Sequence, residues 1–199
     1  KLDSSVKVGP YSIIGEQAEI AKDVEIQSHV VVDGLTQIGE GCIIYPHCSI
    51  GLPPQDFKYK GEPTRLIIGR NNTFREYITL HRGTPKGRFE TVIGDHNYFM
   101  AYCHVAHDCI IGSHVIMANV ATLGGHITIG DHAVLGGLVA IHQFVRVGEY
   151  ALIGGGAIVV QDVPPYVIAS GNRSKLFGLN RIGLQRNGFS KDQMEALKM

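Results

Sequence analysis

The feature that most constrains the fold is an aliphatic side chain that recurs every six residues along most of the chain. A period of six fits neither the 3.6-residue turn of an α-helix nor the two-residue alternation of a long strand. Each unit predicts a short strand and a turn, and three units predict one triangular coil of about 18 residues. One such coil cannot bury its own interior, so the repeat predicts a stack of coils, a parallel β-helix. The repeating side chains are Val8, Ile14, Ile20, Ile26, Val32, Ile38, Ile44 and Ile50, then Ile93, Phe99, Val105, Ile111, Met117, Leu123, Ile129, Leu135, Ile141, Val147, Ile153 and Val159.

Small residues and glycines follow the same period. A small or β-branched side chain lies four positions after each aliphatic, and all four cysteines occupy this position (Cys42, Cys48, Cys103 and Cys109). We interpret the cysteines as packing residues with free thiols, as expected in a reducing cytoplasm. Glycine often follows the aliphatic directly, and we expect it there to provide the positive φ that tight corners require.

The length and charge of the chain limit the kinds of protein to which it can belong. Its 199 residues suit one repeat domain with a small appendage, and we predict a β-helix over 1–165 and the start of a helical domain over 166–199. Eighteen basic and eighteen acidic residues balance, so no global charge favours nucleic acid. No apolar run approaches the roughly 20 residues of a membrane span.

Three segments depart from the period. Residues 52–66 and 81–91 break the register, and we expect them to be loops ejected from the coil, where function is often found. Beyond the two prolines at 164–165, residues 174–187 predict a short helix or turn. Ser190 predicts the start of another helix, with Gln193 in capping-box position.

The ten histidines fall into different classes. His96, His114 and His132 predict a solvated ladder on successive coils. The segment HVAHD at 104–108 is different, because it places two histidines and a carboxylate around one interior valine. One coil later, Gly125 should stack on His107. This arrangement suits a general base beside an oxyanion donor, and satisfied surface histidines are the alternative.

Six segments make the chain similar to the bacterial UDP-N-acetylglucosamine O-acyltransferases, which catalyse the first step of lipid A synthesis. Hexapeptide repeats alone mark only a superfamily, whereas these segments together are specific. The resemblance implies a left-handed β-helix. The segments are PQDFKYKGEPT at 54–64, TLHRGT at 79–84, HVAHD at 104–108, LGGH at 123–126, IHQF at 141–144 and QDVPPY at 161–166.

The resemblance implies roles for individual residues. His107 would be the general base for the sugar 3-hydroxyl, Asp108 would orient it, and the Gly125 N–H would stabilise the oxyanion. No metal or other cofactor is implied. The residues implied to bind substrate are Gln55, Asp56, Lys58, His81, His104, His126, His142, Gln143, Gly155, Asn180 and Arg186.

The family also implies partners. The donor would be an acyl carrier protein bearing an (R)-3-hydroxyacyl chain, and the acceptor UDP-N-acetylglucosamine. The enzyme would be a cytoplasmic homotrimer with clefts between subunits, and the loop around Lys58 would close over the cluster of an adjacent chain. Gly155 matches the position that limits acyl length, and its alternative interpretation is a coil-corner glycine. The chain departs from some members at Ile182 and Asn187, and the family's first coil and most of its C-terminal helical domain have no counterpart.

Four alternatives remain at this level. The same base and oxyanion donor would serve a 3-amino sugar nucleotide. A sister enzyme acylates a 2-amine, but it carries an N-terminal uridine-binding domain that nothing here resembles. A zinc carbonic anhydrase on the same fold would use a set such as His81, His104 and His107. A non-catalytic scaffold would need no histidine cluster.

Overall fold

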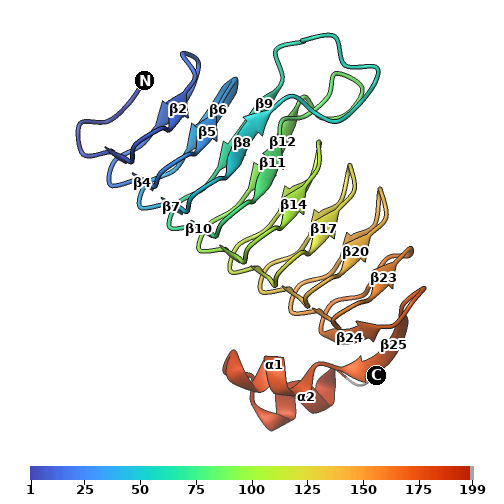
Figure 1. Cartoon of the computed structure of the whole chain (residues 1–199). Helices are drawn as coiled ribbons and strands as arrows, with labels where there is room; N and C mark the ends of the chain where they lie inside the picture. Colours follow the sequence, from blue (N-terminus) through green and yellow to red (C-terminus); the bar gives the residue numbers. More distant parts are fainter. Residues whose placement is uncertain (198–199) are drawn as a thin grey trace.

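The computed structural model describes residues 1–197 and confirms the left-handed parallel β-helix (Figure 1). Up to β23, every third strand joins the same sheet, so three flat faces run along the molecule. The ten-stranded sheet contains, in spatial order, β1 (Lys7–Val8), β4 (Glu25–Ile26), β7 (Ile43–Ile44), β10 (Thr73–Phe74), β13 (Tyr98–Phe99), β16 (Ile116–Met117), β19 (Val134–Leu135), β22 (Leu152–Ile153), β24 (Val167–Ser170) and β25 (Lys175–Leu179).

The other two faces are built in the same way. The eight-stranded sheet contains β2 (Ile13–Ile14), β5 (Val31–Val32), β8 (Ser49–Leu52), β11 (Thr79–His81), β14 (His104–Val105), β17 (Thr122–Leu123), β20 (Ala140–Ile141) and β23 (Ile158–Val159). The seven-stranded sheet contains β3 (Glu19–Ile20), β6 (Leu35–Ile38), β9 (Arg65–Ile68), β12 (Glu90–Ile93), β15 (Ile110–Ile111), β18 (Thr128–Ile129) and β21 (Arg146–Val147).

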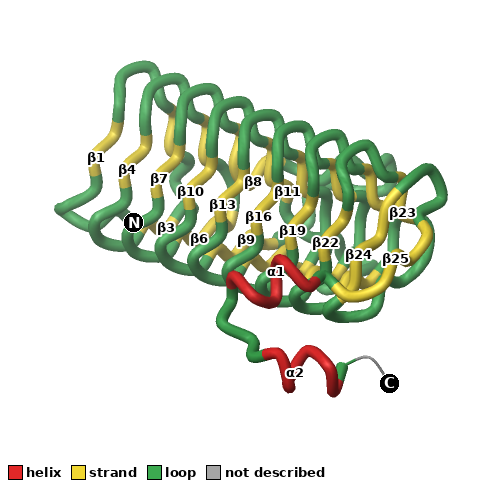
Figure 2. The backbone as a smooth tube through the Cα atoms, turned by 90° about the horizontal axis from the view of Figure 1, so that it is seen from below, coloured by secondary structure: helices red, strands yellow, loops and turns green. Residues whose placement is uncertain are grey.

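Three corners connect the sheets, and Figure 2 shows the coils that they close. We call them the first corner (ten-stranded to eight-stranded sheet), the second corner (eight to seven) and the third corner (seven to ten). Regular rungs pair residues 18 apart, as Val105 pairs with Leu123. Pairing jumps by 30 residues from Ile50 to Leu80 and by 25 from Leu80 to Val105. The extra residues form two loops, at 53–64 and 82–89, and both leave the second corner side by side (Figure 1).

The repeating aliphatic side chains fill the interior. From Ile20 to Val159 they are at most 4% exposed and form one continuous core with the small residues beside them. All four cysteines lie in this core as free thiols, which confirms their interpretation as packing residues. Burial raises the pKa of the Cys109 thiol to about 12, so this thiol stays protonated at neutral pH.

The expected role of the glycines was wrong at most corners. Positive φ is adopted mainly by His, Tyr, Asp and other non-glycine residues, for example His96 at φ 58° and Tyr102 at φ 65°. Gly9 and Gly94 are required for another reason, because a Cβ there would lie 2.6–2.7 Å from backbone atoms of the next coil. Stacked rings accompany the unusual φ. His96, His114 and His132 stack at 5.0 and 4.7 Å, which confirms the predicted ladder on the third corner.

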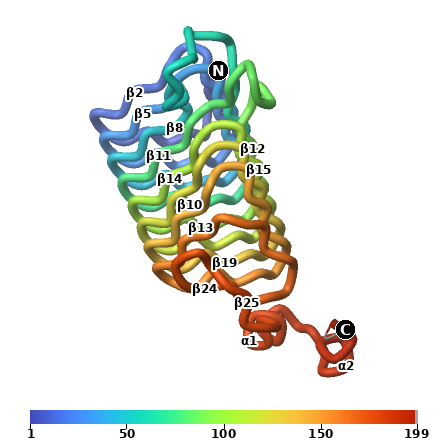
Figure 3. Tube along the Cα trace, turned by 90° about the vertical axis from the view of Figure 1, so that its right-hand side faces the viewer, coloured from blue at the N-terminus to red at the C-terminus, as the bar shows by residue number. Residues whose placement is uncertain are grey.

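The C-terminal end departs from the coil pattern. β24 extends the ten-stranded sheet beyond the two prolines, and β25 turns back antiparallel to it (Figure 3). The helix or turn predicted over 174–187 is therefore wrong for 175–179, whereas α1 (Arg181–Arg186) and α2 (Lys191–Ala196) are helical. Ser190 and Gln193 form the predicted capping box. Among residues 1–197, no helix is long and apolar enough to cross a membrane.

Candidate active site

The second corner collects most of the predicted site residues. The 53–64 loop carries Gln55, Asp56 and Lys58, and successive turns below it carry the histidines and their neighbours. His81 ends β11 and His104 lies in β14. Six further predicted residues follow the strands of the eight-stranded sheet in pairs: His107 and Asp108 after β14, Gly125 and His126 after β17, and His142 and Gln143 after β20.

A hollow of about 300 Å³ lies at this corner. Its walls combine the two loops with the turns of the coil, and its polar groups converge on one space. The lining residues are Gln55, Asp56, Phe57, Lys58, Thr84, Lys86, His107, His126 and Gln143. A larger hollow of about 500 Å³ lies over the seven-stranded sheet near Lys1, but no histidine lines it. Convergent polar groups rather than size therefore identify the candidate site.

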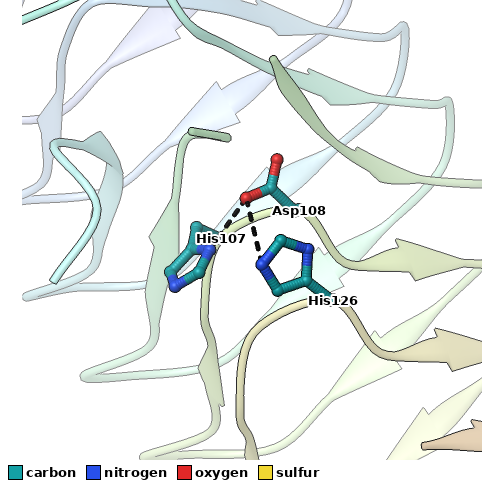
Figure 4. Close-up of side chains that lie close together, drawn as sticks. All are labelled: His107, Asp108 and His126. Carbon is teal, nitrogen blue, oxygen red and sulfur yellow. Dashed lines mark hydrogen bonds and ion pairs between the residues drawn. The ribbon is translucent and has the colours of Figure 1, made fainter. Parts of the chain in front are cut away.

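His107 and Asp108 form a hydrogen-bonded pair (Figure 4). His107 Nδ1 lies 2.8 Å from Asp108 Oδ2, and the Asp108 side chain is fully buried. Burial alone would raise the pKa of this carboxyl, but the hydrogen bonds from His107 and from the 82–89 loop lower that pKa to about 2. Asp108 is thus an anion at neutral pH and holds the Nδ1–H tautomer, so His107 Nε2 keeps a free lone pair.

The 82–89 loop supplies the donors that hold Asp108. Thr84 donates through its N–H at 3.1 Å and its hydroxyl at 2.6 Å, and the Arg88 N–H donates at 2.8 Å. Gly87 permits this approach, because a Cβ there would overlap the Asp108 carboxylate. Sequence reasoning missed these residues and Lys86, since the loop lies outside the repeat. The 13-residue interval from Leu80 to Ile93 marked a loop here, but not its contacts.

Gly125 stacks on His107, as the period predicted. A Cβ on Gly125 would lie 2.6 Å from His107 Cε1 and 2.9 Å from Nε2. Across residues 1–197, no group accepts a hydrogen bond from the Gly125 N–H. A free backbone donor therefore lies beside the free imidazole nitrogen, which is the requirement for stabilising an oxyanion next to a general base.

Three further histidines surround the pair. Burial lowers the pKa of His81 and His126, and it lowers the pKa of His104 to about 4. His81 and His104 lie with ring centroids 5.2 Å apart, and the His126 ring crosses that of His107 at 5.1 Å. These three rings are consequently uncharged at neutral pH and act as neutral hydrogen-bonding groups rather than as cations.

His107, Asp108 and His126 also offer atoms that lie within 4.8 Å of one another, as a metal site would require. Their lone pairs are largely committed, because Asp108 Oδ2 accepts from His107 and from the Thr84 hydroxyl. In the carbonic anhydrase alternative, His81 and His104 use Nδ1 toward Pro53 O and Thr79 Oγ1, and only their Nε2 atoms would be available as ligands. At His107, Asp108 and His126, the engaged carboxylate favours a hydrogen-bonded pair over a zinc centre.

Three predicted residues lie away from the second corner. Gly155 lies on the first corner, where a Cβ would meet only Gly137 O at 3.3 Å and Gly137 N at 3.9 Å. Asn180 is buried at the start of α1, where its side chain caps Gly183 N and donates to Tyr150 O. Arg186 is exposed at the end of α1. His142 is exposed beside Gln143, outside the lining of the hollow.

Comparison with known proteins agrees with this site. Residues 162–199 match the family model described as "Udp N-acetylglucosamine O-acyltransferase; Domain 2", and residues 90–125 match that of bacterial transferase hexapeptide repeats. An acyl-(acyl-carrier-protein)–UDP-N-acetylglucosamine O-acyltransferase from Thermodesulfovibrio yellowstonii is 57% identical over 198 residues, which cover 100% of this chain and 77% of the relative. Its counterpart from Syntrophobacter fumaroxidans is 51% identical with the same coverage.

Solved structures agree with the sequences. The UDP-N-acetylglucosamine acyltransferase of Francisella novicida superimposes with a TM-score of 0.97 at 39% identity, covering 100% of this chain and 73% of that one. The enzyme of Moraxella catarrhalis gives 0.93 at 40% identity, covering 99% and 77%. This chain therefore belongs to the acyl carrier protein-dependent UDP-N-acetylglucosamine O-acyltransferases, and it is an acyltransferase.

Proposed function

We propose that this chain transfers an (R)-3-hydroxyacyl group from acyl carrier protein to the 3-hydroxyl of UDP-N-acetylglucosamine, the first step of lipid A biosynthesis. The names of the relatives reported above give acyl carrier protein, UDP-N-acetylglucosamine and O-acyl transfer, and the matches cover 100% of this chain. The observation that carries the proposal is the His107–Asp108 hydrogen bond together with Gly125, which stacks on the same ring and has a free N–H.

In the first step, His107 Nε2 removes the proton from the 3-hydroxyl as the oxygen attacks the thioester carbonyl. Asp108 keeps the imidazole oriented and stabilises the imidazolium that forms. General-base help of this kind contributes about 10²–10⁴-fold to the rate.

The carbonyl oxygen then becomes an oxyanion and accepts a hydrogen bond from the Gly125 N–H. One such donor is worth roughly 3–4 kcal/mol in the transition state. The tetrahedral intermediate collapses, the bond between carbonyl carbon and sulfur breaks, and His107 returns its proton to the departing thiolate of the carrier protein. The products are the 3-O-acyl sugar nucleotide and free carrier protein. Neither a covalent acyl-enzyme nor a cofactor is part of this scheme.

The rest of the hollow suits the substrates. Lys58 and Lys86 supply positive charge where an anionic diphosphate or a carrier-protein phosphate approaches. Asp56 and Gln143 supply acceptors and an amide for sugar hydroxyls. We include Gln55, His81, His104, His126 and His142 in the same binding surface.

We further propose a homotrimer with sites between subunits. A hollow of about 300 Å³ is at the small end for a ligand of this size, so a second wall is needed. Gly155, Asn180 and Arg186 lie elsewhere on the chain, and they would approach a substrate at the second corner only from a neighbouring copy. The 53–64 loop lies beside the cluster of its own chain, so in this proposal it closes over that cluster as well as facing the neighbour.

The remaining assignments are part of the same proposal. The division at residue 165 would separate the coil that holds the catalytic pair from a C-terminal unit that binds carrier protein. Unpaired cysteines in the core suit a cytoplasmic enzyme. Gly155 leaves space for a long acyl chain, since only Gly137 backbone atoms lie within van der Waals reach of its Cβ position.

The test is to incubate the protein with UDP-N-acetylglucosamine and a series of (R)-3-hydroxyacyl carrier proteins and to identify products by mass spectrometry. We expect a 3-O-acyl product that disappears in His107→Ala. His114→Ala is the matched control, because His114 belongs to the ladder on the third corner and should leave the rate unchanged. Product formation only with the 3-amino sugar nucleotide would establish an N-acyltransferase instead.

A further inference from the structure

The 53–64 loop brings Asp56 and Lys58 to the hollow but has little support of its own. Its internal hydrogen bonds join near neighbours, such as Tyr59 N–H to Asp56 O at 3.0 Å and the Tyr59 hydroxyl to Glu62 O at 2.6 Å. Lys58 and Phe57 are exposed. Such a loop needs an anchor elsewhere to hold one conformation.

All hydrogen bonds between this loop and the rest of residues 1–197 come from two adjacent residues, His81 and Arg82. His81 Nδ1 lies 2.8 Å from Pro53 O, at the start of the loop. Arg82 Nη2 donates to the Tyr59 hydroxyl at 3.2 Å, just after the segment 55–58. The two contacts therefore bracket the residues that line the hollow.

The Arg82 guanidinium is buried between the Asp33 carboxylate and the backbone of Gly34. Only 9% of the residue is exposed, and Nη1 lies 4.0 Å from Asp33 Oδ2, which gives the buried cation a counter-charge. Gly34 lies beneath the guanidinium, and a Cβ there would overlap Nη1. Glycine at position 34 thus leaves the space that the buried Arg82 side chain occupies as it reaches the loop.

We propose that Arg82 is a positioning residue that holds the 53–64 loop over the hollow through Tyr59, and that loss of this contact weakens binding of the sugar nucleotide. The kinetic part rests on the proposed function. Arg82 is absent from the lining of the hollow, so it acts through the loop. A loop that is closed only part of the time lowers the apparent affinity by the closed fraction and leaves the chemistry of the bound complex unaltered.

The test uses Arg82→Met and Tyr59→Phe, the second because it removes one hydroxyl and keeps the ring. Arg70→Met is the matched control, since Arg70 pairs with Asp95 on the third corner and is largely exposed. Trypsin cleavage after Lys58, followed by mass spectrometry, measures loop opening without reference to activity. Steady-state kinetics measure KM for UDP-N-acetylglucosamine and kcat separately.

We expect cleavage after Lys58 to accelerate about tenfold in Arg82→Met and severalfold in Tyr59→Phe, with KM rising by similar factors. We expect kcat to change less than about twofold. Arg82→Lys, which retains a cationic donor group but not the planar guanidinium, should lie between Arg82→Met and the unaltered chain. Unchanged cleavage in both variants overturns the proposal, and so does a loss of kcat without faster cleavage. If Arg82→Met unfolds at a lower temperature than the unaltered chain, Arg82→Gln decides, because Tyr59→Phe also removes the hydrogen bond from the Tyr59 hydroxyl to Glu62 O. Absence of product from the unaltered chain refutes the proposed function, whereas the cleavage rates still decide whether Arg82 anchors the loop.

Discussion

Gly125→Ala tests the centre of the proposed mechanism with one methyl group. The new Cβ would lie 2.6 Å from His107 Cε1, whereas carbon atoms in contact prefer about 3.5–4.0 Å. The imidazole must therefore move by about 1 Å, or the Gly125 backbone must withdraw from it by the same amount. Either movement separates the base from the oxyanion donor.

A displacement of about 1 Å at a reacting centre costs on the order of 10²-fold in rate. That factor corresponds to about 2.7 kcal/mol of transition-state stabilisation. We expect kcat/KM for acyl transfer to fall by this amount, measured by the appearance of the acylated sugar nucleotide under steady-state conditions. Thermal melting should confirm that the variant remains folded.

Gly137→Ala is the matched control. Gly137 occupies the same turn position after β19, but a Cβ there would meet only Asn119 O at 3.3 Å. Its kcat/KM should stay within about twofold of the unaltered chain. An unchanged rate in Gly125→Ala, or an equal loss in both variants, would refute the assignment of Gly125.

Three other outcomes can be measured. Asp108 has a pKa of about 2 in the folded protein against an ordinary 3.8, so its ionised form stabilises the fold by about 2 kcal/mol above pH 4, and this contribution is lost as pH falls toward 2. Asp108→Asn should therefore reduce the dependence of the free energy of unfolding in urea on pH between 4 and 2, and an identical pH dependence in both proteins would contradict the shift. His104 has a pKa of about 4 in the folded protein against an ordinary 6.5, so the unfolded chain binds an extra proton as pH falls from 6.5 to 4, and the free energy of unfolding decreases in that window. His104→Gln should reduce the difference in the free energy of unfolding between pH 7 and 4.5, measured in urea, and an equal difference in both proteins would argue against the shifted pKa. Leu123 is fully buried one coil below the catalytic pair, and Leu123→Ala should lower the free energy of unfolding by about 2–5 kcal/mol, whereas a loss below 1 kcal/mol would indicate a collapsible core.

The fold was largely predictable because every coil repeats one geometry. Residues such as Val105 and Leu123 sit one above the other and meet the same interior, so a six-residue period suffices to locate them. The role of the glycines was not predictable in the same way. Whether a corner needs positive φ or close backbone approach depends on the coil above it, and the structure shows close approach at Gly9 and Gly94. β25 was missed because it follows the last regular coil and pairs antiparallel.

The candidate site was likewise predictable only where it lies within the repeat. The stacking of Gly125 on His107 follows from a shift of one coil, so it was predictable from spacing. The hydrogen bonds of Thr84 to Asp108 and of Arg82 to Tyr59 were not, because both involve loops that leave the repeat. Spacing carries information only where the backbone geometry is periodic.

The sequence by itself determined the coil, the burial of its aliphatic side chains and the column in which His107 meets Gly125, since a rigid repeat converts residue number into position. The tertiary structure alone decided how the two loops fold back on that column. There the buried Asp108 gains its donors and the 53–64 loop gains its anchor, through contacts between residues 20 or more positions apart that no local pattern encodes.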